Sequence, residues 1–134
     1  MPRERIDMSR GEVLDFLRGE RRLVLGTLDA DGTPWADAAP CSLRSEVLYF
    51  SIPRESRSFA NIQRDDRVCC SLDRYPTYYE IKGATLHGHA VAVTDAATLA
   101  KISFDQSSTG DAAVFGVGLD DVVSFDFAKL KNRP

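Results

Sequence analysis

The sequence predicts a mainly β protein of the α+β class, in which about six antiparallel strands form a small barrel with two or three short helices. One observation is a series of extended runs rich in β-branched and aromatic residues, separated by turn residues. A second is the pair Gly83 and Gly88 inside one long extended run, where glycine usually marks a bulge or a tight barrel corner. With 134 residues, 43% of them hydrophobic, the chain is expected to form a single domain over residues 1–134.

The charge of the chain excludes several classes of partner. The sequence has 20 acidic and 17 basic residues and a formal net charge of -3, whereas binding to nucleic acid or to an anionic membrane needs a basic surface. No run approaches the length of a transmembrane helix, and the first residues carry charge but no apolar stretch. We therefore expect no nucleic-acid partner, no membrane partner and a cytoplasmic location.

The three cysteines do not form the framework of a secreted disulfide-rich protein, because their number is odd and their spacing irregular. Cys69 and Cys70 are adjacent, so their side chains point to opposite faces of a strand. We interpret both as small core residues rather than as a redox pair.

The first predicted element is a helix from about Arg10 to Arg18, which ends near Gly19. Ser9 and Glu12 form a capping box at its start, and the apolar residues that follow share one face. We expect this helix to have a structural role as a plug over one end of the barrel.

Three strands joined by short polar breaks follow the helix. The first break, Asp29–Gly32, is a tight turn, because Asp and Gly tolerate the positive φ that hairpins need. Pro40 lies inside the second strand and predicts an edge position, a bulge or a break. A break would leave neighbouring backbone groups free to bond water or a ligand. The expected strands cover residues 23–28, 33–43 and 47–52.

The third strand leads into a polar loop and a short helix, expected over residues 58–64. Ser56, Arg57 and Ser58 surround the start of that helix. The free N–H groups of a helix start attract anions, and hydroxyl and guanidinium groups bond them. The sequence therefore predicts an anion-binding cradle at this turn.

The remaining elements rest on the same kinds of signal. Asp95 is expected to cap a helix that runs to about Phe104, residues 105–110 to form a loop, and the tail from Lys129 to fray. The expected strands cover residues 67–72, 78–81 with 84–93, 113–117 and 122–127.

No recognised catalytic motif is present. There is no nucleophile elbow, P-loop, dinucleotide fingerprint or zinc-ligand spacing, so we predict no catalytic residue and no metal site. His87 and His89 share one strand face and offer two imidazoles to a metal or a haem, but no third ligand stands in register. We interpret them as a surface or interface pair. Trp35 and the tyrosines of residues 75–79 are interpreted as core or interface anchors rather than ligand clamps.

Several segments, in this order and spacing, carry a resemblance to a known family. They are Gly32 to Cys41, a second strand after an Asp-x-Asp-Gly turn; Tyr49 to Ser58, a strand and Ser-Arg loop; Asn61 to Val68, which fits N-[IL]-x-x-[DN]-x-R-V; and Glu80 to Ala90, with Lys-Gly and then Gly-x-Ala. These segments resemble the pyridoxamine 5'-phosphate oxidase-like family, the flavin-binding split β-barrels.

The resemblance implies a six-stranded antiparallel split barrel with Greek-key character and a homodimer with FMN at the interface. It implies that the backbone of residues 38–41 faces the ring system and ribityl chain, that residues 51–52 pack near the isoalloxazine, and that residues 56–58 bind the phosphate. The second subunit would approach at Lys82. The implied cofactor-binding residues are Ala38, Ala39, Pro40, Cys41, Ser51, Ile52, Ser56, Arg57, Ser58 and Lys82.

The chain departs from the oxidases of this family at three cation positions. In those oxidases an arginine begins and a lysine ends the second strand, both on the phosphate, where this chain has Asp37 and Ser42. The lysine of the Ser-Arg-Lys loop is Ser58. Each lost charge-assisted hydrogen bond is worth about 1.5–3 kcal/mol. We therefore do not expect an oxidase that forms pyridoxal phosphate.

The leading hypothesis is an FMN-dependent oxidoreductase of this family that acts on a small-molecule substrate of unknown identity. The flavin would carry the hydride or electron transfer, and the protein would supply placement, hydrogen bonds and a partly dry pocket. The alternatives are an F420-dependent reductase of the same fold, since the Lys82-Gly83 pattern also occurs in that branch, a non-catalytic flavin- or haem-binding protein, and a degenerate barrel with an empty pocket.

Overall fold

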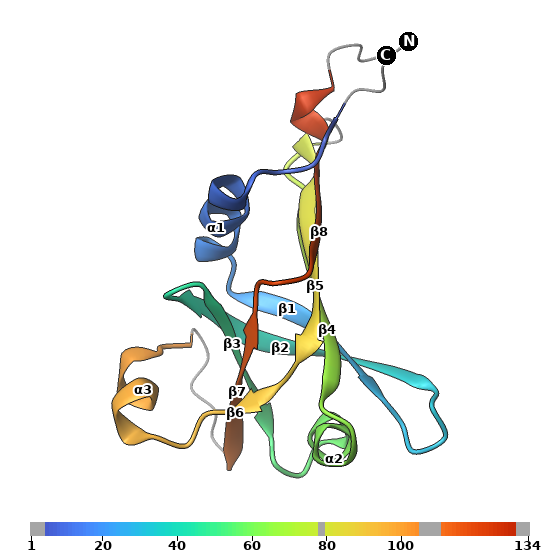
Figure 1. Ribbon diagram of the computed structural model, residues 1–134, viewed down its shortest axis with the longest axis vertical. Coiled ribbons are helices and arrows are strands. Elements are labelled where there is room, and N and C mark those ends of the chain that lie inside the picture. The colour runs from blue at the N-terminus through green and yellow to red at the C-terminus, as the bar shows by residue number, and fades with distance from the viewer. Residues whose placement is uncertain (1–4, 78–79, 105–110, 131–134) are drawn as a thin grey trace.

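The structure, a computed structural model, describes residues 5–77, 80–104 and 111–130. One antiparallel sheet of eight strands, in the order β6-β7-β3-β2-β1-β4-β5-β8, curls around the core (Figure 1). The strands are β1 (Arg22–Leu28), β2 (Pro34–Arg44), β3 (Val47–Pro53), β4 (Arg67–Arg74), β5 (Lys82–His89), β6 (Val91–Ala92), β7 (Ala112–Gly118) and β8 (Val122–Asp126). The helices are α1 (Arg10–Arg18), α2 (Arg57–Arg64) and α3 (Ala96–Lys101), with a short 3₁₀ helix at Phe127–Lys129.

The curl of the sheet comes from a strand that serves both of its ends. β5 pairs with β8, continues through the single residue Ala90, and then pairs with β7 as β6. The predicted split-barrel fold is therefore confirmed, but the sheet has eight strands rather than six. One reason is that the N–H of Ala90 donates to the carbonyl of Asp66, which divides the predicted strand 84–93 in two.

The predicted interruptions at Gly83 and Gly88 are wrong. β5 runs through both glycines, and its register with β4 contains no bulge. Gly83 instead permits close packing, because a Cβ there would lie 2.7 Å from the carbonyl oxygen of Leu72 and 2.9 Å from the ring of Phe125. The absent side chain serves the contact between strands, and the strand itself stays regular.

Other element boundaries shift by a few residues. α2 begins at Arg57, with Ser56 as its N-cap, and α3 ends at Lys101 rather than Phe104. Residues 80–81 are not part of a strand, because the N–H of Glu80 closes a turn on the carbonyl of Thr77. The extended run predicted at 78–79, the loop at 105–110 and the frayed tail at 131–134 lie outside the described residues.

The core lies inside the curl of the sheet and under α1. The predicted capping box of α1 is present, and the helix buries Val13, Phe16 and Leu17. Its inner face and the inward side chains of the strands, such as Phe50 and Leu25, form one apolar cluster. α2 lies at a distant end of the sheet, beside the ends of β3 and β4 (Figure 1). Among the described helices, none combines the length and apolar character that crossing a bilayer requires.

Candidate functional site

β2 changes its pairing partner at Pro40, and the sheet opens there. Residues 34–40 of β2 pair with β1, whereas residues 41–44 pair with β3. Proline has no N–H, so Pro40 cannot extend the ladder to β3. Residues 51–53 of β3 pair with β7, and within the described residues they have no partner on β2. We call this interruption between residues 34–40 of β2 and 51–53 of β3 the split.

Three residues direct backbone hydrogen-bonding groups into the split. The N–H of Cys41 donates to the carbonyl of Arg21, 2.8 Å away, on the β1 side of the strand. Because successive residues of an antiparallel strand point their backbone groups to alternate sides, Pro40 and Ala38 point theirs towards β3. The same alternation turns the N–H and carbonyl of Ser51 towards β2. The break anticipated from Pro40 therefore leaves one edge of each strand available.

The N-terminus of α2 stands at the open end of the split. The Oγ of Ser56 accepts a hydrogen bond from the N–H of Phe59 at 3.1 Å and donates one to the carbonyl of Pro53 at 2.7 Å. Ser56 is thus the N-cap of the helix, and both of these bonds fix the turn that leads out of β3.

Arg57 is held by groups of the protein itself. Its Nε donates to Oδ1 of Asp29 at 2.9 Å and its Nη2 to Oδ2 of the same carboxylate at 2.5 Å. The guanidinium carbon also lies 4.1 Å from the centre of the Trp35 ring. The hydrogen bonds from Arg57 and Asn61 lower the pKa of Asp29, and the hydrogen bond to Asp29 raises the pKa of Arg57. The pair is therefore charged at neutral pH.

A second carboxylate, that of Asp37, reaches the same helix start from β2. Its Oδ2 accepts from the Oγ of Ser58 at 2.6 Å and from Nε1 of Trp35 at 2.8 Å. Ser58 is completely buried, so its hydroxyl is turned inward towards this carboxylate. We call Asp29, Asp37, Arg57 and Ser58 the cradle.

The structure brings together some of the implied cofactor residues and separates others. Backbone groups of Ala38, Pro40 and Ser51 border the split, and residues 56–58 stand at its end. The side chains of Ala39, Cys41 and Ile52 point into the core and are at most 3% exposed. Lys82 pairs with Arg74 at the end of β5 far from α2. Seven residues of strand, on the order of 23 Å, separate it from the end of β5 near α2.

Two residues of this region were missed by sequence reasoning. Asp29 was interpreted as a turn former, which it also is, since its N–H and carbonyl bond Thr33 and Gly32. Its side chain, only 12% exposed, additionally binds Arg57, and Asn61 donates to it at 2.9 Å. The two partners are 28 and 32 residues away, and no local signal in the sequence reports such a contact.

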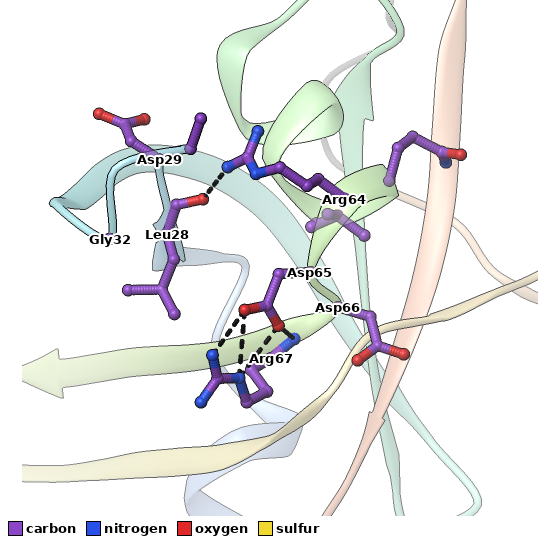
Figure 2. Close-up of a pocket in the computed structure, with 10 residues that line it drawn as sticks. Leu28, Asp29, Gly32, Arg64, Asp65, Asp66 and Arg67 are labelled. Atoms are coloured by element: carbon purple, nitrogen blue, oxygen red, sulfur yellow. Dashed lines mark hydrogen bonds and ion pairs between the residues drawn. The ribbon is translucent and has the colours of Figure 1, made fainter.

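A surface pocket of about 680 Å³ lies on the far side of this turn (Figure 2). Figure 2 shows Arg64 of α2 reaching to the carbonyl of Leu28, while Asp65 and Arg67 face each other across the floor. A smaller pocket of about 420 Å³ connects this region with Arg57. Both pockets share Asp29 and Arg64, so the carboxylate of the cradle borders open space.

The two histidines have different surroundings. Nδ1 of His89 lies 2.6 Å from Oδ1 of Asp66, and both side chains are largely exposed. His87 is exposed and stands opposite Cys69 on β4. Among the described residues, no group of three or more potential ligands of the His, Cys, Asp and Glu types is close enough to hold a metal ion.

Comparison with known proteins identifies relatives at the level of family and fold. A family model described as pyridoxamine 5'-phosphate oxidase matches residues 9–130. A conserved hypothetical protein from Mycobacterium tuberculosis is 21% identical, with a TM-score of 0.83 over 100% of this chain and 94% of that chain. An FAD-binding protein from Mycobacterium smegmatis is 16% identical, with a TM-score of 0.75 over 90% and 97% of the two chains. A protein described as an F420 reductase is 20% identical, with a TM-score of 0.61 over 81% and 93%. No curated protein matches the sequence.

Proposed function

Because the chain belongs to the pyridoxamine 5'-phosphate oxidase family, we propose that it is a flavin-dependent oxidoreductase that binds FMN at the split between β2 and β3. The observation that carries this proposal is the break in the ladder at Pro40, which leaves backbone donors and acceptors of Ala38 and Ser51 facing each other. The pyrimidine edge of a flavin carries the complementary donors and acceptors.

In this proposal the protein binds and orients, and the flavin supplies the hydride or electron transfer. The main chain at Ala38, Pro40 and Ser51 would fix the edge of the ring system. Ile52 and Cys41 would support the site from the core side, since their side chains lie directly beneath these strands. We assign no general acid or base, and the small-molecule substrate is not specified by these residues.

The residues fit the two ends of FMN unequally. The split fits a planar ring with hydrogen-bonding groups along one edge. The cradle fits a phosphate poorly, because the charge of Arg57 is matched by Asp29 and the hydroxyl of Ser58 is donated to Asp37. Ser56, Arg57 and Ser58 remain the groups nearest to where the family implies a phosphate, but each already has a partner.

We further propose that two copies of the chain form a homodimer. The outer face of the sheet carries a row of small or apolar side chains that crosses five strands without a charge. The row consists of Ala38, Val24, Ser71, Thr85 and Val123. A second copy seated on this row would lie beside the split, because Ala38 belongs to both. Lys82 is far from the split of its own chain, so its proposed cofactor contact requires the second copy.

F420 is the second candidate cofactor. A similar solved structure is described as an F420 reductase, and the Lys82-Gly83 pattern at the start of β5 is consistent with that branch. A non-catalytic flavin- or haem-binding protein is the remaining alternative, and His87 and His89 are the residues that would favour haem.

A titration separates these candidates. We expect FMN, added to the purified apo-protein, to show quenched fluorescence and a shifted absorption band, with a smaller response to F420 and no Soret shift with haem. Ala38→Pro should weaken FMN binding by about tenfold, since it removes one donor facing the split, worth roughly 1 kcal/mol. Its N–H takes no part in the β1 ladder, so the strand is expected to survive.

Ala36→Pro is the matched control, because residue 36 has the same orientation on the same strand but lies outside the proposed contact. Equal losses in the two variants would contradict the assignment of the split. A response to F420 alone would replace FMN by F420, and a response to no ring compound would reject the proposal.

A further inference from the structure

Resting on the proposed function, we infer that Asp29 and Asp37 determine which flavins this chain accepts. The two carboxylates close the cradle to a phosphate dianion, so the ligand is held by its ring system and the main chain. A flavin with an uncharged side chain, such as riboflavin, then binds about as well as its phosphorylated form. The preference follows from three features of the cradle.

The first feature is that Asp29 already uses Arg57 as a phosphate would. Both carboxylate oxygens accept from the guanidinium in the two-point geometry that also suits a phosphate. Asn61 adds a third bond to Oδ1 at 2.9 Å, and the side chain of Asp29 is only 12% exposed. One face of the guanidinium lies on Trp35, which fixes its direction. A phosphate arriving here would have to displace or adjoin a carboxylate that is held at three points.

The second feature is that Asp37 brings a negative charge to the N-terminus of α2. Helix N-termini favour one nearby anion, and the Oδ2 of Asp37 occupies that region through Ser58 and Trp35. The Ser58 hydroxyl is completely buried and points its proton at this carboxylate. It is therefore not available to a ligand unless the turn is rebuilt.

The third feature is the balance of charge in the cradle. Asp29 and Asp37 together outnumber Arg57, which is the cation closest to the helix start in the described structure. Arg64, the next cation along α2, is directed to the carbonyl of Leu28 and to Oδ1 of Asn61. A dianion would thus enter a site whose local charge is already negative, and like charges at this range repel.

The test compares FMN with riboflavin, because the two share one ring and differ by the phosphate. We expect wild-type protein to bind them with dissociation constants within about threefold of each other in a fluorescence titration. Asp29→Asn and Asp37→Asn should each tighten FMN binding by about tenfold while leaving riboflavin unchanged, since each removes one opposing charge. Asp31→Asn is the matched control, because this carboxylate lies in the same turn but bonds Thr33 rather than α2.

The outcomes distinguish this inference from the proposed function. A wild-type preference for FMN of about a hundredfold, or no gain of FMN affinity in either variant, would overturn the inference and leave the flavin site standing. Binding of FMN by the variants alone would support the inference and reject flavin use by the natural chain. Binding of neither compound by any of the proteins would reject both. Riboflavin affinity and the unfolding midpoint report whether each variant keeps its fold, and the wild-type ratio is decisive even where a variant unfolds.

Discussion

The three cysteines occupy three different environments, although two of them are neighbours in the chain. Cys41 and Cys70 are buried, and burial raises the pKa of each thiol to about 12. Cys69 is only partly buried and lies on the outer face, where its Sγ would be 2.5 Å from a Cβ at Gly26. The interpretation of residues 69 and 70 as core residues is thus right for Cys70 and wrong for Cys69.

These environments predict selective modification. In the folded protein at pH 8, iodoacetamide should alkylate Cys69, whereas Cys41 and Cys70 should react only after unfolding, because the thiolate is the nucleophile. Mass spectrometry of the labelled peptides measures this. Cys69→Ser should abolish native-state labelling and Cys41→Ser should leave it unchanged. Alkylation of Cys41 at the rate of Cys69 would show that the curl of the sheet opens under native conditions.

The cradle shows what residue-level reasoning can and cannot reach. Arg57 and its two flanking serines were predictable as anion-binding groups, because a hydroxyl, a guanidinium and a helix start lie within a few residues. That Asp29 would neutralise Arg57 was not predictable, because the contact spans 28 residues and Asp is common in turns for local reasons. The departure at Asp37 was visible in the sequence, whereas its bond to Ser58 required the structure.

At the scale of the elements, β5 depends on a close approach that glycine alone permits. A Cβ at Gly83 would meet the backbone oxygen of Leu72 at 2.7 Å, and backbone cannot move aside as a side chain can. The strand lies between β4 and β8, so a displacement would disturb both neighbours.

We therefore expect Gly83→Ala to lower the free energy of unfolding by about 1–3 kcal/mol, the usual cost of overpacking. Gly11→Ala is the matched control, because nothing lies within 4 Å of a Cβ there and the residue is in α1. That variant should raise the free energy of unfolding by roughly 0.5–1 kcal/mol. Denaturant titrations of both proteins measure the difference. Two variants of equal stability would mean that β4 and β8 shift freely.

Elements with local signals were predicted well, and pairings were not. The capping box of Ser9 and Glu12 located α1, and the turn at Gly32, with its φ of +86°, located the hairpin of β1 and β2. The pairings of β1 with β4 and of β3 with β7 join segments far apart in the chain. Nothing in either segment specifies its partner, so the strand order and the division at Ala90 came from the structure.

At the scale of the whole molecule, the outer face of the sheet is left without a covering layer by the described helices. Val24 is 49% exposed and Val123 is 63% exposed, on strands that lie at the centre and at the edge of this face. Apolar side chains gathered on one face of a sheet favour contact with another molecule. This row is the surface on which the proposed homodimer rests.

A charge placed in the row should therefore separate the two copies. We expect wild-type protein to have twice the mass of the chain in light scattering, and Val24→Glu to have the mass of one chain, because an unpaired charge would be buried at the contact. Leu99→Glu, on α3 and 37% exposed, is the control and should keep the wild-type mass. A wild-type monomer would reject the homodimer, and a dimeric Val24→Glu protein would place the contact elsewhere.

The partner change of β2 at Pro40 has a wider consequence. A flat molecule bound in the split would complete an unfinished stretch of sheet and be recognised by peptide groups, which every amino acid carries. Such a site places few demands on the identity of its side chains, so relatives can diverge greatly in sequence and still hold the same type of ring. What they must preserve is a geometry: one strand that leaves its neighbour at a fixed position.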